Sequence, residues 1–219
     1  MRSHQRLVAF TGAIALSLFL FISYLKLDHS AGPVRFVGLS HPTWGDKTAP
    51  IQIVLFEDLK CKGCKQFNEE FLPKILEKYV STKKASLTFV PIAFLERGDA
   101  LGNAFLSVHS KFGDLALTFL QKIESHSQDG ALAWDSDENL LNYAKDIPGV
   151  DVDYLKACIE SEKFLPELEK NYQIAEQVMG KRVSTPALYI NGFRVNTFDW
   201  FEIEDHIEKI LTEDANVSP

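Results

Sequence analysis

The chain has 219 residues, of which 46% are hydrophobic and 24% charged, and its formal net charge is −7 at pH 7. This length fits one domain carrying an insertion, and this composition is typical of a globular chain with a buried core. The negative charge disfavours nucleic-acid binding, because neutralising phosphates over a broad surface needs an excess of lysine and arginine. Three cysteines are too few for a small scaffold held together by disulfides.

An apolar segment opens the chain. Arg2 and Arg6 precede an uncharged, mostly apolar run at residues 7–25, and Lys26 closes it. At a rise of ~1.5 Å per residue this run is about 28 Å long as a helix, close to the hydrocarbon thickness of a bilayer. No small-x-small cleavage site follows it. We therefore predict that residues 1–27 are an uncleaved membrane anchor, in preference to a cleaved signal sequence, and that the domain lies outside the cytoplasm.

A linker and the first half of a sheet follow. Residues 28–46 are polar and contain glycine and proline, as a linker does. Residues 51–56 are apolar and rich in β-branched side chains, which predicts a buried central strand. Helical spacing at 62–79 predicts a helix kinked by Pro73, and residues 86–94 predict a second strand that ends near Pro91.

Residues 99–180 are predicted to be largely helical. We expect one amphipathic helix at 104–123, a second at 136–145 capped by Ser136 or Asp137, and two more at 152–160 and 164–179. The pattern then becomes extended. Asn191-Gly192 separates two apolar runs, at 187–190 and 193–195, and predicts a β-hairpin. A closing amphipathic helix is expected at 200–211.

Cys61 and Cys64 stand where the first strand gives way to a helix. Unpaired N–H groups and the positive end of the dipole at a helix N-terminus favour thiolate over thiol. The spacing puts both sulfurs in the first turn, close enough for a reversible disulfide in which one thiol attacks and the other resolves the mixed disulfide. Nearby lysines are expected to lower the thiolate pKa further if they point toward the sulfurs: Lys60, Lys62 and Lys65.

Other uses of the pair stay open. A structural disulfide would close so small a loop that it would constrain the chain little. A zinc site would need two more ligands, and the histidines are scattered singly. The alternative function is a thioredoxin-fold module that holds Cu(I) between Cys61 and Cys64. Cys158, on a short amphipathic helix, is expected to be a buried, inert thiol.

Pro186 heads the strand predicted at 187–190. Proline removes a ladder donor, so it is unusual there unless a cis bond holds the preceding backbone open for an extended substrate. Residues 56–64 (FEDLKCKGC) together with 185–192 (TPALYING) resemble the DsbA-like branch of the thioredoxin superfamily. The resemblance covers roughly residues 43–211. It implies an α/β, thioredoxin-like fold formed by residues 47–98 and 181–213, with residues 99–180 as an inserted helical subdomain.

The resemblance also implies the roles of individual residues. It makes Cys61 the nucleophile, Cys64 the resolving thiol, Pro186 the cis-proline, and Thr185 the residue before it. Lys62 and Gly63 join Thr185 and Pro186 as expected substrate contacts. Asp58 and Glu57 are the candidates for the proton relay. No metal and no cofactor is expected.

The implied activity is exchange of disulfides with cysteine-containing exported proteins. The direction (oxidation, reduction or isomerisation) stays open, and a glutathione-transferase-like relative is disfavoured because it would not need Cys64. The expected location is a bacterial envelope, with the protein anchored in the inner membrane and facing the periplasm, or released there if residues 1–27 are cleaved. A membrane redox partner is implied by turnover, and a monomer is expected because no dimerisation domain is visible.

Overall fold

The computed structural model describes residues 32–36, 41–127, 133–180, 182–196 and 198–217. The chain divides into two units, Met1–Val34 and Arg35–Pro219. The predicted anchor at residues 1–27 and part of the linker at 28–46 lie outside the described residues. Within the described ranges, no helix is both long and apolar enough to cross a bilayer.

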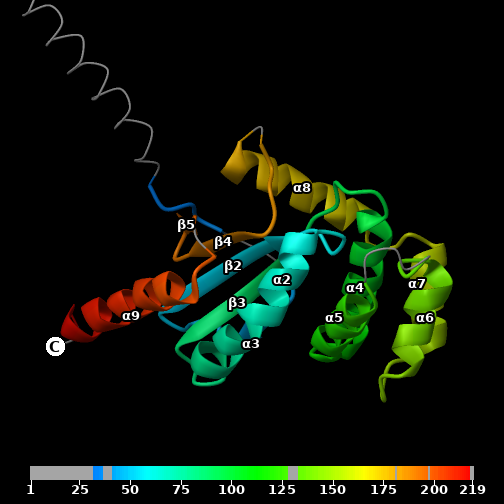
Figure 1. The fold of residues 1–219 in the computed structure, drawn as a ribbon, viewed down its shortest axis with the longest axis horizontal. Helices are drawn as coiled ribbons and strands as arrows, with labels where there is room; N and C mark the ends of the chain where they lie inside the picture. The colour runs from blue at the N-terminus through cyan, green and yellow to red at the C-terminus, as the bar shows by residue number, and fades with distance from the viewer. Residues whose placement is uncertain (1–31, 37–40, 128–132, 181, 197, 218–219) are drawn as a thin grey trace, which may run out of the picture. The chain divides into compact units, whose positions relative to one another are not determined.

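One mixed sheet organises the second unit, with its strands in the order β1-β3-β2-β4-β5 (Figure 1). These strands are β1 (Thr43–Gly45), β2 (Ile51–Glu57), β3 (Ala85–Pro91), β4 (Ala187–Ile190) and β5 (Phe193–Val195). The middle strand, β2, runs parallel to β3 and antiparallel to β4. Apart from Gln52, every residue of β2 is buried, as expected for a central strand covered on both faces. The sheet therefore holds the carboxyl end of β2 at its centre.

The hairpin at the end of the sheet is confirmed. Asn191 and Gly192 join β4 to β5 with φ angles of 48° and 82°, the positive values that both turn positions require. The pairing of β4 with β2 sets Ala187 opposite Phe56. This register brings the start of β4, with Pro186 just before it, to the end of β2 that leads into the cysteine motif.

The helix predicted at 62–79 is interrupted, as Pro73 led us to expect. It consists of α2 (Lys62–Glu70), α3 (Leu72–Ile75) and a π-helical turn, η1 (Leu76–Val80). The break falls at Phe71, where φ widens to −116°. Pro73 occupies the first turn of α3, where a proline without an N–H group is tolerated.

In the described residues between β3 and β4 the chain forms five helices: α4 (Gly98–Phe112), α5 (Leu115–His126), α6 (Asp137–Lys145), α7 (Val152–Glu160) and α8 (Leu165–Met179). The expectation of one helix at 104–123 is wrong, because the chain turns between α4 and α5. Gly113 ends α4 with a φ of 55°, and its N–H donates to the carbonyl oxygen of His109. A positive φ favours glycine and stops a helix there. Ser136 caps α6 by accepting the Asn139 N–H, as predicted.

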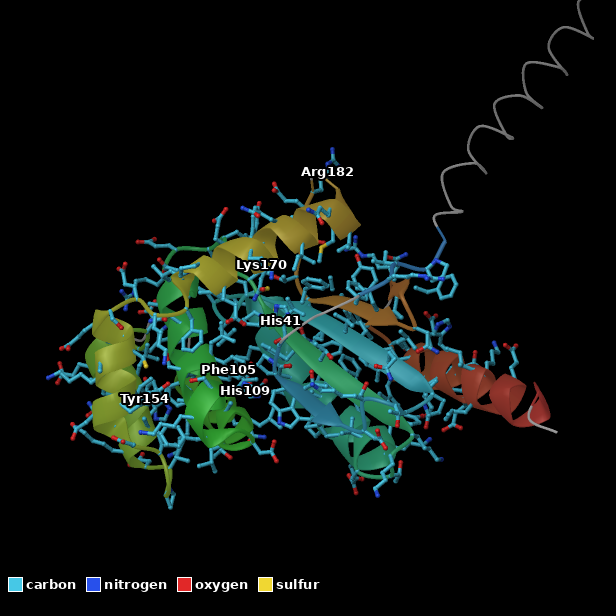
Figure 2. The ribbon with its side chains drawn as sticks, turned by 180° about the vertical axis from the view of Figure 1, so that it is seen from behind. His41, Phe105, His109, Tyr154, Lys170 and Arg182 are labelled. Carbon is cyan, nitrogen blue, oxygen red and sulfur yellow. The ribbon has the colours of Figure 1, made fainter. Side chains whose placement is uncertain are left out.

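The helical insertion packs on the sheet through aromatic side chains of α4. Phe105 and His109, both labelled in Figure 2, lie against the sheet as seen from behind. The Phe105 ring is 5.0 Å from that of Phe89 in β3, and the His109 ring is 6.1 Å from that of Trp44 in β1. These contacts join the insertion to the two strands on that side of β2.

The closing helix, α9 (Trp200–Val217), is longer than the predicted span of 200–211. It packs beside η1, where the Tyr79 hydroxyl donates to Glu208 and the rings of Tyr79 and Trp200 lie 6.5 Å apart. In Figure 1 α2 and α3 cross the face of the sheet that is turned to the viewer. The amino end of α2 therefore stands over the end of β2.

Candidate active site

Cys61 and Cys64 occupy the amino end of α2. Cys61 is the residue before the helix, with extended backbone angles, and its carbonyl oxygen accepts the Lys65 N–H. Cys64 lies in the first turn and is 1% exposed, whereas Cys61 is partly exposed. Both are free thiols. Only the first sulfur is therefore open to a substrate, as the assigned order of attack requires.

The Cys61 thiolate is stabilised by hydrogen bonds. Its pKa is lowered to about 5, chiefly because the Cys64 thiol donates to it, and the backbone N–H groups of Cys64 and Gly63 donate as well. Partial burial opposes this shift but is outweighed. A reactive cysteine needs this combination of exposure and lowered pKa.

Cys64 has the opposite properties. Its pKa is raised above the ordinary range, first by burial, then by its hydrogen bond to Cys61, and then by the charge that Glu57 carries when it is ionised. Cys64 therefore stays protonated in the reduced pair, and it needs a proton whenever it leaves a disulfide.

Two of the three nearby lysines point elsewhere. Lys60 forms an ion pair with Asp135, and its ammonium lies 4.4 Å from the centre of the Trp134 ring. Lys65 donates to the carbonyl oxygen of Ser127 and lies 3.7 Å from the Glu69 carboxylate. The condition for these two lysines to lower the Cys61 pKa, that they point toward the sulfurs, is therefore not met, and hydrogen bonds at the helix end account for the low value.

The second motif lies directly against the first. The Thr185–Pro186 peptide bond is cis, and the Cys61 sulfur is 3.5 Å from the carbonyl oxygen of Thr185. A Cβ atom added to Gly63 would lie 3.4 Å from Cδ of Pro186. Lys62 and Gly63 are exposed beside this loop. All four predicted substrate contacts thus border the reactive sulfur.

Glu57, one of the two relay candidates, is fully buried at the end of β2 and interacts electrostatically with both cysteines. Its pKa is raised well above normal, first by burial and then by repulsion from Glu124, and the Cys61 thiolate adds to the effect. Its oxygen Oε2 accepts a hydrogen bond from Asn68, whereas Oε1 is buried without a hydrogen-bond partner among the described residues. Glu57 and Cys64 interact electrostatically, and a protonated Glu57 carboxyl is therefore a candidate to exchange a proton with Cys64.

Asp58, the other relay candidate, has a structural role. Its carboxylate accepts the backbone N–H of Lys60, and those of Phe94 and Leu95 in the loop after β3, each at 2.9 Å. A Cβ added to Gly98 would lie 2.7 Å from this carboxylate. The prediction that Asp58 carries a proton is therefore disfavoured, because its oxygens are committed to holding two loops together.

Sequence reasoning missed two residues of this region, Asn68 and Glu124. The side-chain amide of Asn68 donates at 2.7 Å to Glu57 and also at 2.7 Å to Glu124. The spacing of Asn68 one turn after Cys64 was a usable signal, because residues i and i+4 share a helix face. Glu124 comes from α5 and gave no local signal.

Elsewhere, Cys158 is 3% exposed, in agreement with the prediction of a buried thiol. Within the described part of the chain, no group of three or more histidine, cysteine, aspartate or glutamate residues is placed to hold a metal ion.

A strand, a redox-capable cysteine pair at a helix end and a cis-proline loop beside it define a thioredoxin-fold protein built for thiol–disulfide exchange. A family model described as Thioredoxin matches residues 39–209. The chain belongs to the thioredoxin family.

Curated proteins similar to this chain are disulfide bond formation proteins. The chain is 25% identical over 218 residues to a probable disulfide bond formation protein D of Bacillus anthracis, covering 96% of this chain and 99% of that protein. It is 28% identical to disulfide bond formation protein D of Bacillus subtilis (strain 168), covering 78% and 77% of the two chains.

Solved structures agree. DsbA of Chlamydia trachomatis matches with a TM-score of 0.74 at 28% identity, over 84% of this chain and all of that one. Oxidised BdbD of Bacillus subtilis matches with a TM-score of 0.71 at 28% identity, over 78% and 93%. The protein is a thiol–disulfide oxidoreductase with a DsbA-like thioredoxin fold and a helical insertion.

Proposed function

We propose that this protein is a dithiol oxidant, which introduces disulfides into cysteine-containing proteins through Cys61 and Cys64. The observation that carries the proposal is the asymmetry of the pair: an accessible Cys61 with a pKa of about 5 beside a buried Cys64 with a raised pKa. A stabilised thiolate makes the reduced form more stable, and therefore makes the disulfide a stronger oxidant. The Cys61 value lies between about 7 for thioredoxin and about 3.5 for DsbA.

The reaction proceeds in two exchanges. A substrate thiolate attacks the Cys61 sulfur of the Cys61–Cys64 disulfide, so that a mixed disulfide forms and Cys64 leaves and takes up one proton. A second substrate thiolate then attacks the substrate sulfur of the mixed disulfide, and Cys61 leaves as a thiolate. Two electrons pass from the substrate to the enzyme. Of the two substrate protons, one ends on Cys64 and the other in solvent.

The leaving-group properties match these steps. Cys61 departs easily in the second exchange because its thiolate is already stable near neutral pH. Cys64 departs in the first exchange only if a proton is available. We assign its delivery to Glu57, because burial raises the pKa of this carboxyl well above its usual range and so favours its protonated form.

Thr185 and Pro186, with Lys62 and Gly63, form the proposed contact surface for substrate. The carbonyl oxygen of Thr185 faces the reactive sulfur at 3.5 Å. An extended peptide that pairs with the Thr185 backbone would set its own cysteine against Cys61.

The cellular setting is part of the proposal. The apolar run at 7–25 supports a membrane-anchored protein that faces the periplasm of a bacterial envelope, where disulfides persist. Its substrates would be exported proteins with cysteines. The names of the Bacillus relatives, disulfide bond formation protein D, favour the oxidising direction. A membrane redox partner would restore the disulfide, and the protein would act as a monomer.

The test is the reduction potential of the Cys61–Cys64 pair in the full chain, held in mild detergent and equilibrated with glutathione buffers. We expect a value above about −200 mV, on the oxidising side toward DsbA at about −120 mV. A value at or below about −230 mV would make the protein a reductase instead. If the pair shows no reversible equilibrium, the redox function fails, and a Cu(I) titration of the reduced protein decides whether the metal-binding alternative replaces it.

Two variants check the division of roles. Cys64→Ser should accumulate a mixed disulfide between Cys61 and a cysteine-containing peptide, because the resolving thiol is missing. Cys61→Ser should form none. Equal trapping by both variants would contradict the assignment of Cys61 as the attacking sulfur.

A further inference from the structure

Three buried polar side chains link the redox site to the helical insertion. Glu57 ends β2, Asn68 lies on α2, and Glu124 lies on α5, and they are 0%, 6% and 6% exposed. One nitrogen, Nδ2 of Asn68, donates both of its hydrogens, to Oε2 of Glu57 and to Oε1 of Glu124, each at 2.7 Å. The two carboxyl groups thus share a single donor in the interior.

Ionising both carboxyl groups at once has a high free-energy cost. Burial disfavours each carboxylate, and a second negative charge a few ångströms from the first disfavours it again. The Nδ2 group of Asn68 donates one hydrogen bond to each carboxyl but carries no positive charge. It can therefore stabilise either carboxylate, but it cannot neutralise two of them at once.

The surroundings decide which carboxyl ionises first. Burial raises the pKa of Glu124 to about 8, with repulsion from Glu69 on α2, while Asn68 and Lys65 of α2 oppose the rise. Among the described residues, no cation is a cause of the shift in the Glu57 pKa. The thiolate form of Cys61 and an ionised Glu124 both raise that pKa, and so both favour the protonated form of Glu57. Glu124 therefore loses its proton first, and its charge then retains the proton on Glu57.

We propose that Glu124 is a positioning residue of the redox reaction: by ionising across Asn68, it keeps Glu57 protonated in alkaline solution and so preserves the proton that Glu57 passes to Cys64. The proposal rests on the function proposed above. In the step concerned, the Cys64 thiolate that leaves the disulfide takes the Glu57 proton, which yields a Cys64 thiol and a Glu57 carboxylate. Solvent, which receives the substrate protons, returns a proton to Glu57.

The test follows the rate at which dithiothreitol cleaves the Cys61–Cys64 disulfide of the full chain, from about pH 6 to pH 9.5. The ratio of variant to wild-type rates is the readout, because the ionisation of dithiothreitol itself cancels in it. Glu124→Gln keeps the acceptor for Asn68 but cannot ionise. We expect a ratio near one below about pH 7 and a fall of about threefold or more by pH 9.

Two comparisons separate this role from simple packing. Glu70→Gln is the matched control, since Glu70 is an exposed acid on α2 that pairs with Gln66 and not with the cluster. It should give a flat ratio. In a Glu57→Gln background, Glu124→Gln should have no further pH-dependent effect, because the proton that it controls is gone.

The proposal would be overturned, with the oxidant function left intact, by either of two results. One is a rate ratio for Glu124→Gln that does not change with pH. The other is a fall in cleavage rate at high pH that is equally large when Glu124→Gln is made in the Glu57→Gln background. Infrared spectra of the unmodified chain give an independent check that needs no folded variant. They should show one buried carboxyl band that disappears around pH 8, as Glu124 ionises, and a second that persists. The absence of any protonated carboxyl band at pH 6 would also refute it. Failure of the wild-type protein to undergo cleavage would instead refute the proposed function.

Discussion

The sulfur of Cys61 lies 3.5 Å from the carbonyl oxygen of Thr185, a residue 124 positions further along the chain. The sheet creates this proximity. The antiparallel register of β4 with β2 sets Ala187 opposite Phe56, so the residues just before β4 lie beside the loop that follows β2. The helical insertion can therefore be long without separating the Cys61 sulfur from the proposed substrate surface at Thr185 and Pro186.

The first prediction concerns the origin of the low Cys61 pKa. Thiolate absorbance of the reduced protein should titrate with a midpoint near pH 5. Lys60→Ala and Lys65→Ala should leave this midpoint unchanged within a few tenths, because both ammonium groups pair with groups away from the sulfur. A midpoint that rises by a full unit in either variant would show that the lysines, and not the helix end, hold the thiolate.

A second prediction follows from linkage. The folded pKa of Cys61, about 5, lies below the ordinary value of 9.0 for a cysteine. The unfolded chain therefore binds more protons between these values, and the contribution of Cys61 to stability grows as pH rises from 5 to 9 and is lost as pH falls through 5. Urea unfolding of the reduced protein at several pH values should show this rise relative to Cys61→Ser. The oxidised protein, which has no titrating thiol there, should not.

Asp58 should matter for stability more than for chemistry. Asp58→Ala leaves three backbone N–H groups without their acceptor and is expected to cost about 3 kcal/mol in the free energy of unfolding. Gly98→Ala should also destabilise, because its Cβ would displace the same carboxylate from 2.7 Å. Urea denaturation measures both. In Asp58→Asn, a pH profile of disulfide cleavage with the wild-type shape would agree with a structural role, and a profile that loses its pH dependence would restore Asp58 as a proton carrier.

Gly63 offers a test of the substrate surface. In Gly63→Ala the added Cβ meets Pro186 at 3.4 Å and the Cys61 sulfur at 3.8 Å, which are ordinary contacts. The free energy of unfolding should rise by about 0.5 kcal/mol, because alanine has a higher helix propensity than glycine. The methyl group should slow exchange with a protein substrate several-fold and leave exchange with a small thiol nearly unchanged. Equal slowing of both would indicate a change at the thiol itself.

Glu124, the buried acid on α5, should lower the free energy of unfolding as pH rises. Glu124 has a pKa of about 8 in the folded chain against 4.5 ordinarily, so the folded state binds more protons between these values and stability falls with increasing pH. Glu124→Gln should remove this loss. In urea unfolding experiments at pH 8, the free energy of unfolding of the variant should exceed that of the wild type by roughly 1 to 3 kcal/mol. At pH 4.5 the two should differ little. A constant difference at both pH values would mean that Glu124 does not titrate as a buried acid.

Much of the architecture was predictable because its signals are local. A short apolar run rich in β-branched residues, helical spacing, Asn-Gly and a cysteine pair after an apolar strand each depend on a few adjacent residues. They placed β2, the hairpin, α6, α7 and the redox motif close to where the structure has them. The helix predicted at 104–123 failed because a positive φ at one glycine overrides a continuous apolar pattern.

The sequence by itself determined the candidate reactive residues: a dithiol at a helix start and a proline at a strand start need only neighbours along the chain to be recognised. Only the tertiary structure decided how protons and charges are distributed among them. Asp58 and Glu57 are adjacent, yet the first is tied to backbone N–H groups and the second is sealed beside Asn68 and Glu124. Burial and charge repulsion depend on which distant elements pack together, and no pattern along a single segment carries that information.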